Sequence, residues 1–281
     1  MYFKSKVYAS FDGIKLSGYL WEPQEKPKAL INLVHGFGEY SERYNFWAMR
    51  FVEKGYVVHA IDNRGHGKSE GKRGHVNKHD EFLNDIDVLV KESNVLYPDL
   101  PQFIYGHSLG GNIVTNYILK RNHDFKGAIL SSPWFKLSFN PSALTIFFAR
   151  ILQKVYPKFT QLSKLDVKGI SHDPQVIDAY IKDPLIHEKI SARMFFEIYN
   201  AGLWALANSG KLTIPVLIQH GTGDNITSYK ASKEFFKNAK EKGKDIEYKE
   251  WVELYHELHN EKEKDDIFEF IYNWIEKKLS A

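Results

Sequence analysis

One short stretch constrains the fold of this chain more than any other: Gly106-His107-Ser108-Leu109-Gly110-Gly111. Residues 102–105 before it have the side chains of a β-strand, and residues 112–119 after it have those of a helix. A G-x-S-x-G sequence at such a turn predicts a nucleophile elbow, in which strained backbone exposes a serine hydroxyl at the carboxyl end of a strand. The glycines leave room for strand and helix to pack, and the helix N-terminus provides N–H groups for an oxyanion. Ser108 is therefore the predicted nucleophile.

Strands and helices alternate along most of the chain. Apolar runs typical of strands buried on both faces occur at 29–34, 56–61, 127–132 and 214–220, and a further strand is expected at 245–252. Helices are expected at 42–54, 80–96, 228–241 and 262–279. Asp12-Gly13 is a hairpin signal between two N-terminal strands, 2–10 and 14–22. This order predicts an α/β fold with a mostly parallel central sheet flanked by helices.

The alternation lapses between Ser132 and Leu212, in a segment rich in aromatic side chains. Residues 141–156 carry a wide apolar stripe at helical spacing, and five prolines from 133 to 184 divide the segment into short helices and turns. We expect residues 134–211 to form a helical cap inserted into a core made of 1–133 and 212–281. The apolar stripe is explained by ordinary packing on the core, by an acyl-binding slot with an outer face toward lipid, or by both.

A serine hydroxyl needs a general base, and the base needs an acid that holds its tautomer. When the nucleophile lies on an elbow, these partners follow in the order acid, then histidine, each after a later strand. Asp224 follows the strand at 214–220, and His256 follows the strand at 245–252. Asp62 also ends a strand, but it precedes the serine, so we interpret it as structural. His259 stays an alternative base.

The oxyanion hole is expected to use the backbone N–H of Leu109, directly after the nucleophile, and that of Phe37 in the loop after an earlier strand. His256 and His259 belong to an H-E-x-H sequence, which is not the H-E-x-x-H pattern of helical zinc sites. No third ligand is evident, so no metal is expected. Serine hydrolysis by such a triad requires no cofactor.

Composition narrows the class of protein. The 281 residues include no cysteine, which excludes disulfides, thiolate metal sites and a cysteine nucleophile. The net charge of +3 is spread along the chain, which argues against a nucleic-acid surface and permits weak attraction to anionic lipid. Neither a signal-peptide pattern nor an apolar run of transmembrane length is present. We expect a cytoplasmic protein, peripheral to membranes at most; the sequence carries no signal for its oligomeric state.

With these residues in place, the chain resembles the monoacylglycerol lipase and lysophospholipase group of α/β-hydrolases. The matching stretches are 35–44 (H-G-F-G-E-Y-S-E-R-Y), 62–69 (D-N-R-G-H-G-K-S), 106–111, 220–224, 255–256, 172–174, Tyr180 and 183–187 (D-P-L-I-H). The resemblance implies the α/β-hydrolase fold and a triad of Ser108, Asp224 and His256. It offers no motif over 134–170, so it implies nothing about acyl-chain length.

The resemblance also implies that Glu39, Arg43, Tyr180 and His259 surround the alcohol part of the ester, since these side chains supply donors and acceptors for a glycerol group. A structural ion pair, for example of Glu39 with Arg43, is the alternative. The expected activity is hydrolysis of a monoacylglycerol-like, single-chain lipid ester through an acyl-enzyme. A lysophospholipase, a general carboxylesterase and a non-catalytic ligand receptor stay as alternatives. A dehalogenase or epoxide hydrolase is disfavoured, because those enzymes place aspartate at the elbow.

Overall fold

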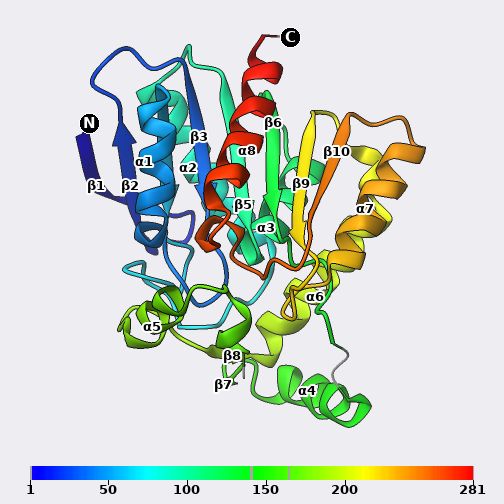
Figure 1. Cartoon of the computed structure of the whole chain (residues 1–281). Coiled ribbons are helices and arrows are strands. Elements are labelled where there is room, and N and C mark those ends of the chain that lie inside the picture. Colours follow the sequence, from blue (N-terminus) through cyan, green and yellow to red (C-terminus); the bar gives the residue numbers. More distant parts are fainter. Residues whose placement is uncertain (1, 140–141, 164, 281) are drawn as a thin grey trace.

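The computed structural model of the chain describes residues 2–139, 142–163 and 165–280. A single large sheet crosses it in the order β1-β2-β4-β3-β5-β6-β9-β10 (Figure 1). β1 and β2 form the antiparallel edge, and the pairs from β4 to β10 are parallel. The strands are β1 (Tyr2–Ala9), β2 (Lys15–Glu22), β3 (Ala29–Val34), β4 (Tyr56–Ile61), β5 (Gln102–His107), β6 (Gly127–Ser131), β9 (Val216–Gly221) and β10 (Ile246–Trp251). This is the predicted α/β architecture.

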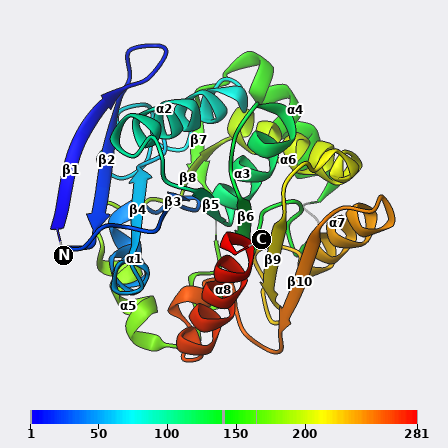
Figure 2. The same ribbon diagram turned by 90° about the horizontal axis from the view of Figure 1, so that it is seen from above.

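Helices cover both faces of the sheet, as the view from above shows (Figure 2). The apolar side chains of α1 and α8 join one buried cluster, and those of α2, α3, α6 and α7 join another on the opposite face. Their bounds are α1 (Asn45–Glu53), α2 (Asp80–Leu96), α3 (Leu109–Lys120), α6 (Ala192–Ala207), α7 (Tyr229–Glu241) and α8 (Lys264–Leu279). No helix in the described ranges combines the length and apolar character that a bilayer-spanning segment needs.

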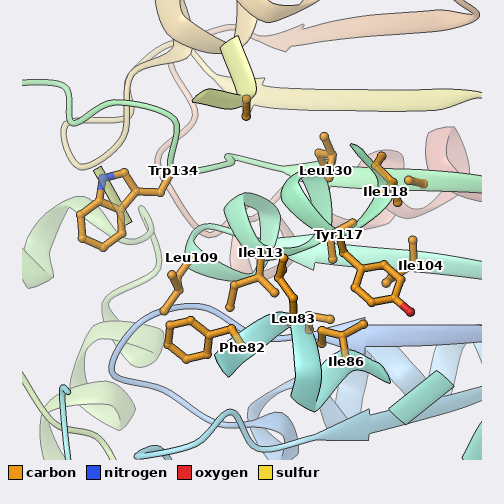
Figure 3. Packing of buried hydrophobic residues seen from close by; sticks show 14 of the residues in the cluster. Phe82, Leu83, Ile86, Ile104, Leu109, Ile113, Tyr117, Ile118, Leu130 and Trp134 are labelled. Carbon is orange, nitrogen blue, oxygen red and sulfur yellow. The ribbon is translucent and has the colours of Figure 1, made fainter. Parts of the chain in front are cut away.

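α3 is the helix that positions the predicted elbow. It is buried on all sides over Leu109–Ile118, because it lies between the sheet and the helices α2 and α6. In Figure 3, Ile113 and Tyr117 of α3 pack close to Leu83 and Ile86 of α2. The helix begins at Leu109, three residues earlier than predicted from 112–119, so it starts directly after Ser108. A helix packed this closely leaves the turn before it little freedom.

The segment between β6 and β9 gathers beyond one end of the sheet, at the bottom of Figure 1. It contains α4 (Ala143–Val155), β7 (Thr160–Leu162), α5 (Pro174–Lys182), β8 (Lys189–Ser191) and α6. α6 has 16 residues and is longer than the short helices expected here, since no proline interrupts residues 185–214. The small β7–β8 sheet had no sequence signal. Pro141 lies outside the described residues, and the division into core and cap stays a prediction.

Short 3₁₀ helices complete the described structure. They are η1 (Ser41–Tyr44), η2 (Val167–Gly169), η3 (Ser209–Lys211) and η4 (Leu258–Asn260).

Truncating the buried face of α3 should destabilise the whole fold. Ile113 is 0% exposed, so Ile113→Ala should lower the free energy of unfolding by about 2–5 kcal/mol. Ile181 on α5 is 66% exposed, and the same substitution there should change it by no more than about 0.5 kcal/mol. Urea unfolding followed by circular dichroism measures both, and equal losses would contradict the packing described for α3.

Candidate active site

The turn between β5 and α3 has the geometry of a nucleophile elbow. Ser108 has φ 54° and ψ −116°, a left-handed backbone conformation rare for a residue with a side chain. A Cβ atom on Gly106 would collide with the carbonyl of Gly110, and one on Gly110 with the carbonyl of Val34. The Ser108 N–H donates to the carbonyl of Ser131 on β6 at 3.0 Å. The glycines are thus required by close approach, and the neighbouring strands hold the turn.

Asp224 lies in the loop after β9, three residues beyond its end, and accepts hydrogen bonds on both carboxylate oxygens. The backbone N–H groups of Ile226 and Thr227 donate to Oδ1 at 2.7 and 2.9 Å. The ring N–H groups of His220 and His256 donate to Oδ2 at 2.9 and 2.6 Å. This set of donors holds the carboxylate in one orientation, toward His256.

The protonation of His256 follows from its partner. A carboxylate only accepts, so Nδ1 of His256 carries the hydrogen toward Asp224 and Nε2 is left as a base. Burial lowers the pKa of His256, but the charge of Asp224 and the hydrogen bond to it raise the pKa above its ordinary value. Burial raises the pKa of Asp224, yet His256 and the hydrogen bond from His220 hold it well below its ordinary range. The pair is therefore suited to accept a proton at Nε2 and stabilise the imidazolium that results.

The loop that carries His256 is held from two sides. Ser132, after β6, donates from Oγ to the His256 carbonyl at 2.8 Å. The N–H of His256 donates to the Gly169 carbonyl at 3.3 Å, and that of Glu257 to the Ile170 carbonyl at 2.7 Å. Residues 169–170 belong to the segment between β6 and β9. The predicted base is therefore positioned partly by the predicted cap.

Glu261 adds a buried carboxylate to this junction. It accepts from the Tyr255 N–H at 2.7 Å and from the His172 N–H at 3.0 Å. Nδ1 of the His172 ring lies 3.0 Å from Oε1, the oxygen that accepts from Tyr255, and the ring stacks on that of Tyr255 at 3.7 Å. Glu261 thus ties the residue before His256 to residues 171–172.

Ser108 and His256 line one cavity of about 690 Å³. Phe37, after β3, shares the wall with them, and Leu109 is the first residue of α3. The apolar part of the cavity comes mainly from α4 and the residues before it. Its members include Leu137, Phe148, Ile151, Leu152 and Val155. One cavity is therefore lined both by the predicted catalytic residues and by the apolar side chains of α4. The roles of Phe37 and Leu109 in an oxyanion hole stay predictions.

Three side chains of the wall, which we call the polar part of the cavity, are Glu39, Tyr180 and Glu257; Gln161, Ser163, Asp166 and Asn225 are further polar residues of the lining. Arg43 lies behind this wall. Its Nη1 donates to Glu39 at 2.6 Å and to Glu257 at 2.9 Å, and its Nη2 donates to Glu257 at 2.9 Å. The Arg43 guanidinium also lies 5.0 Å from the centroid of the Tyr180 ring. The structure therefore contains the ion pair between Glu39 and Arg43 that was the alternative to a binding role.

His259 is fully enclosed and does not line the cavity in the described structure. Its ring stacks on Tyr44 at 4.5 Å, and neither ring nitrogen has a hydrogen-bond partner among the described residues. Burial lowers the pKa of His259 to about 4, so this ring is neutral at neutral pH. The binding roles of Arg43 and His259, and the role of His259 as an alternative base, stay predictions.

Sequence reasoning missed Glu257. It follows His256 in the chain and had been considered only as part of a metal-binding pattern, although a charged residue beside a candidate base is itself a signal. Among the described residues, no three His, Asp or Glu side chains gather as metal ligands. Asp62 accepts from the backbone N–H groups of Ser41 and Lys68 at 2.8 Å each, which agrees with its structural interpretation.

Comparisons with known proteins match this arrangement to one family. Residues 25–263 match the family described as serine aminopeptidase, S33. An abhydrolase domain-containing protein of Dictyostelium discoideum is 35% identical over 94% of this chain, which spans only 28% of that protein. The monoacylglycerol lipase of Mycolicibacterium smegmatis is 31% identical, over 97% of this chain and 96% of its own. The structure of Paleococcus ferrophilus monoacylglycerol lipase superposes with a TM-score of 0.84 at 29% identity, covering 98% and 99% of the two chains.

The hydrogen bond from His220 to Asp224 should tune the base. Without that donor the carboxylate charge is less satisfied and attracts a proton on His256 more strongly. His220→Phe should therefore raise the pKa of His256 and move the acid limb of kcat/KM upward by about one pH unit. The pH dependence of ester hydrolysis measures this shift.

The control is Ser232→Ala. It removes the hydroxyl 2.8 Å from the other ring nitrogen of His220 but keeps the donor to Asp224. The acid limb should stay within a few tenths of a pH unit of the wild type. The remaining titratable groups around His256 are unchanged in both variants: Glu39, His107, Glu257 and His259. An unchanged acid limb in His220→Phe would show that His220 does not act through Asp224.

Proposed function

The chain belongs to the serine aminopeptidase S33 family of α/β-hydrolases, and on that premise we propose that it cleaves monoacylglycerols and similar single-chain lipid esters. It is a serine ester hydrolase of the lipase and esterase group. Relatives named monoacylglycerol lipase match nearly its full length, which supports the narrower substrate class.

The observation that carries the proposal is one cavity with two kinds of wall. Its polar part lies beside the predicted catalytic residues. Glu257 follows His256 in the chain, and Glu39 accepts from the N–H of Gly36 at 2.7 Å, a residue that lines the cavity with Ser108. Its apolar part is made largely by α4. The volume of about 690 Å³ is within the range of pockets that enclose one small ligand. An ester of one acyl chain and a small hydroxylated alcohol satisfies both walls.

The mechanism follows from the proton positions at the site. Nε2 of His256 takes the Ser108 proton as Oγ attacks the ester carbonyl, and Asp224 stabilises the imidazolium. The N–H groups of Phe37 and Leu109 bind the oxyanion. His256 then protonates the departing alcohol, which leaves an acyl group on Ser108. Water activated by the same nitrogen releases the fatty acid.

We further propose that α4 meets a lipid surface. The helix presents apolar side chains to solvent, including Phe147 at 58% and Val155 at 78% exposure. Its Phe148 and Ile151 also line the cavity. A helix that is apolar toward both the cavity and the outside can bind at the boundary between head groups and acyl chains, and lets a single-chain lipid pass between membrane and site.

Removing the nucleophile tests the catalytic assignment. Ser108→Ala should abolish the burst of alcohol release from a chromogenic ester, because no acyl-enzyme can form. Asp224→Asn should lower kcat by roughly 10⁴, as in comparable triads, because it disturbs the tautomer of His256. Stopped-flow absorbance measures both. Wild-type turnover by Ser108→Ala would show that hydrolysis does not depend on Ser108 and would overturn the mechanism.

Removing one hydroxyl tests the alcohol part of the site. Tyr180→Phe keeps the ring against Arg43 but deletes a donor from the polar part of the cavity. We expect kcat/KM for a monoacylglycerol to fall about 3–10-fold, the effect of one hydrogen bond. An aryl ester of the same acid, whose leaving group has no hydroxyls, should be affected less than twofold. Equal losses on both esters would remove Tyr180 from alcohol recognition.

A further inference from the structure

The polar part of the cavity contains an excess of negative charge. Two carboxylates, Glu39 and Glu257, face one guanidinium, that of Arg43. Glu39 is 2% exposed and Glu257 is 3% exposed, so bulk water screens neither group well. Besides the Asp224–His256 pair, four ionisable groups packed here are neutral near pH 7. Burial lowers the pKa values of His107 and His259 and raises those of Tyr44 and Tyr180.

Both carboxylates have the hydrogen bonds of an ionised group. Glu39 accepts from the Gly36 N–H, the Tyr44 hydroxyl and Arg43. Glu257 accepts a two-pronged contact from Arg43 and a further hydrogen bond from Asn260 at 2.7 Å. Burial raises the pKa of Glu257, but the charge and hydrogen bonds of Arg43 bring it down to about 2. The donors around both carboxylates therefore favour two negative charges against one positive charge in the polar part of the cavity.

The single cation is not available to an anionic ligand. Three of the five N–H donors of Arg43 are used by Glu39 and Glu257, and Tyr180 lies against its guanidinium. Arg43 is absent from the described lining of the cavity, whereas both carboxylates are part of it. A ligand in the polar part of the cavity thus meets carboxylate oxygens and the Tyr180 side chain before it meets the guanidinium.

We propose that Glu257 is a specificity-determining residue, which makes the alcohol site net negative and restricts the enzyme to esters of uncharged or cationic alcohols. The inference rests on the proposed function and narrows it. Glycerol hydroxyls can donate to the carboxylate oxygens, and a quaternary ammonium group is attracted by them. A phosphate group has no proton to donate when fully ionised, and it must approach two carboxylates in a poorly hydrated wall.

Charge repulsion of this kind is large enough to decide between substrates. Like charges a few ångströms apart near a protein surface repel by several kcal/mol, and tenfold discrimination needs only about 1.4 kcal/mol. A phosphate monoester carries about −1.5 to −2 charges at pH 7. We therefore expect lysophosphatidate to be hydrolysed about 10²-fold less efficiently than the monoacylglycerol with the same acyl chain. The lysophospholipase alternative is disfavoured for anionic head groups by the same reasoning.

The experiment compares three decanoyl esters below their micelle concentrations: decanoylcholine, 1-decanoylglycerol and 1-decanoylglycerol 3-phosphate. Each kcat/KM is divided by the rate of alkaline hydrolysis of that ester, which removes differences in intrinsic reactivity. The wild-type enzyme should cleave the choline and glycerol esters with values within tenfold of each other and the phosphate ester about 10²-fold less well. Raising the salt from about 0.1 to 0.5 M should change the ratio little, because the site is buried.

Glu257→Gln is the test variant and Glu257→Asp the matched control. The glutamine keeps the size of the side chain but removes its charge, so the ratio of phosphate to glycerol ester should rise at least tenfold. The aspartate keeps the charge and should keep a ratio within threefold of the wild type. Ratios taken within one variant cancel any loss of folded protein, and the wild-type comparison stands even if a variant fails to fold.

Two outcomes would overturn the inference: a wild-type phosphate-to-glycerol ratio within threefold of one, or a ratio that Glu257→Gln leaves unchanged. A different result would separate it from the proposed function. If the wild-type enzyme cleaves an aryl decanoate but none of the three alcohol esters, the proposed lipid-ester substrate itself is wrong.

Discussion

Ser108 has a positive φ, a backbone conformation that costs a residue other than glycine about 1–3 kcal/mol. The surroundings provide what is needed to keep it there. β5 lies between β3 and β6 in the sheet, and α3 is buried against the sheet within one residue of the turn. Gly110 lets the first turn of α3 approach the end of β3, where a side chain would collide with Val34. The order of the strands then brings Asp224 and His256, which follow β9 and β10, to the same end of the sheet as Ser108.

The parts of this arrangement that the sequence predicted are those with local signals. Strands buried on both faces appear as apolar runs, and Asp224 lies just beyond one of them, whereas the elbow and His256 each follow a shorter or more polar run of strand-forming residues. The order of elements in parallel sheets then limits where these side chains meet. The α/β-hydrolase fold and the family were predicted correctly on that basis.

The parts that could not be predicted depend on contacts between distant residues. The sequence around Arg43 does not show whether this side chain lies in the cavity or behind its wall. Its position depends on the ion pair with Glu257, which lies 214 residues away. The β7–β8 pairing joins two three-residue strands, too short to show a periodic pattern. The apolar stripe of α4 fitted both core packing and an acyl slot, and only the cavity shows that Phe148 and Ile151 line a channel.

The segment between β6 and β9 contacts the rest of the molecule closely over residues 169–191 and much less over α4. Its residues 169–191 bond the two loops that carry predicted catalytic residues. The Ile170 carbonyl accepts from the N–H of Glu257 after His256, and the N–H of His187 donates to the carbonyl of Gly38 after Phe37. α4, in contrast, packs chiefly on α6 and leaves much of its surface in solvent. A motion of the whole segment would break these hydrogen bonds to the loops of the predicted base and the predicted oxyanion residue. A displacement of α4 alone would leave these hydrogen bonds intact, so α4 is the part of the segment whose movement would disturb the predicted catalytic residues least.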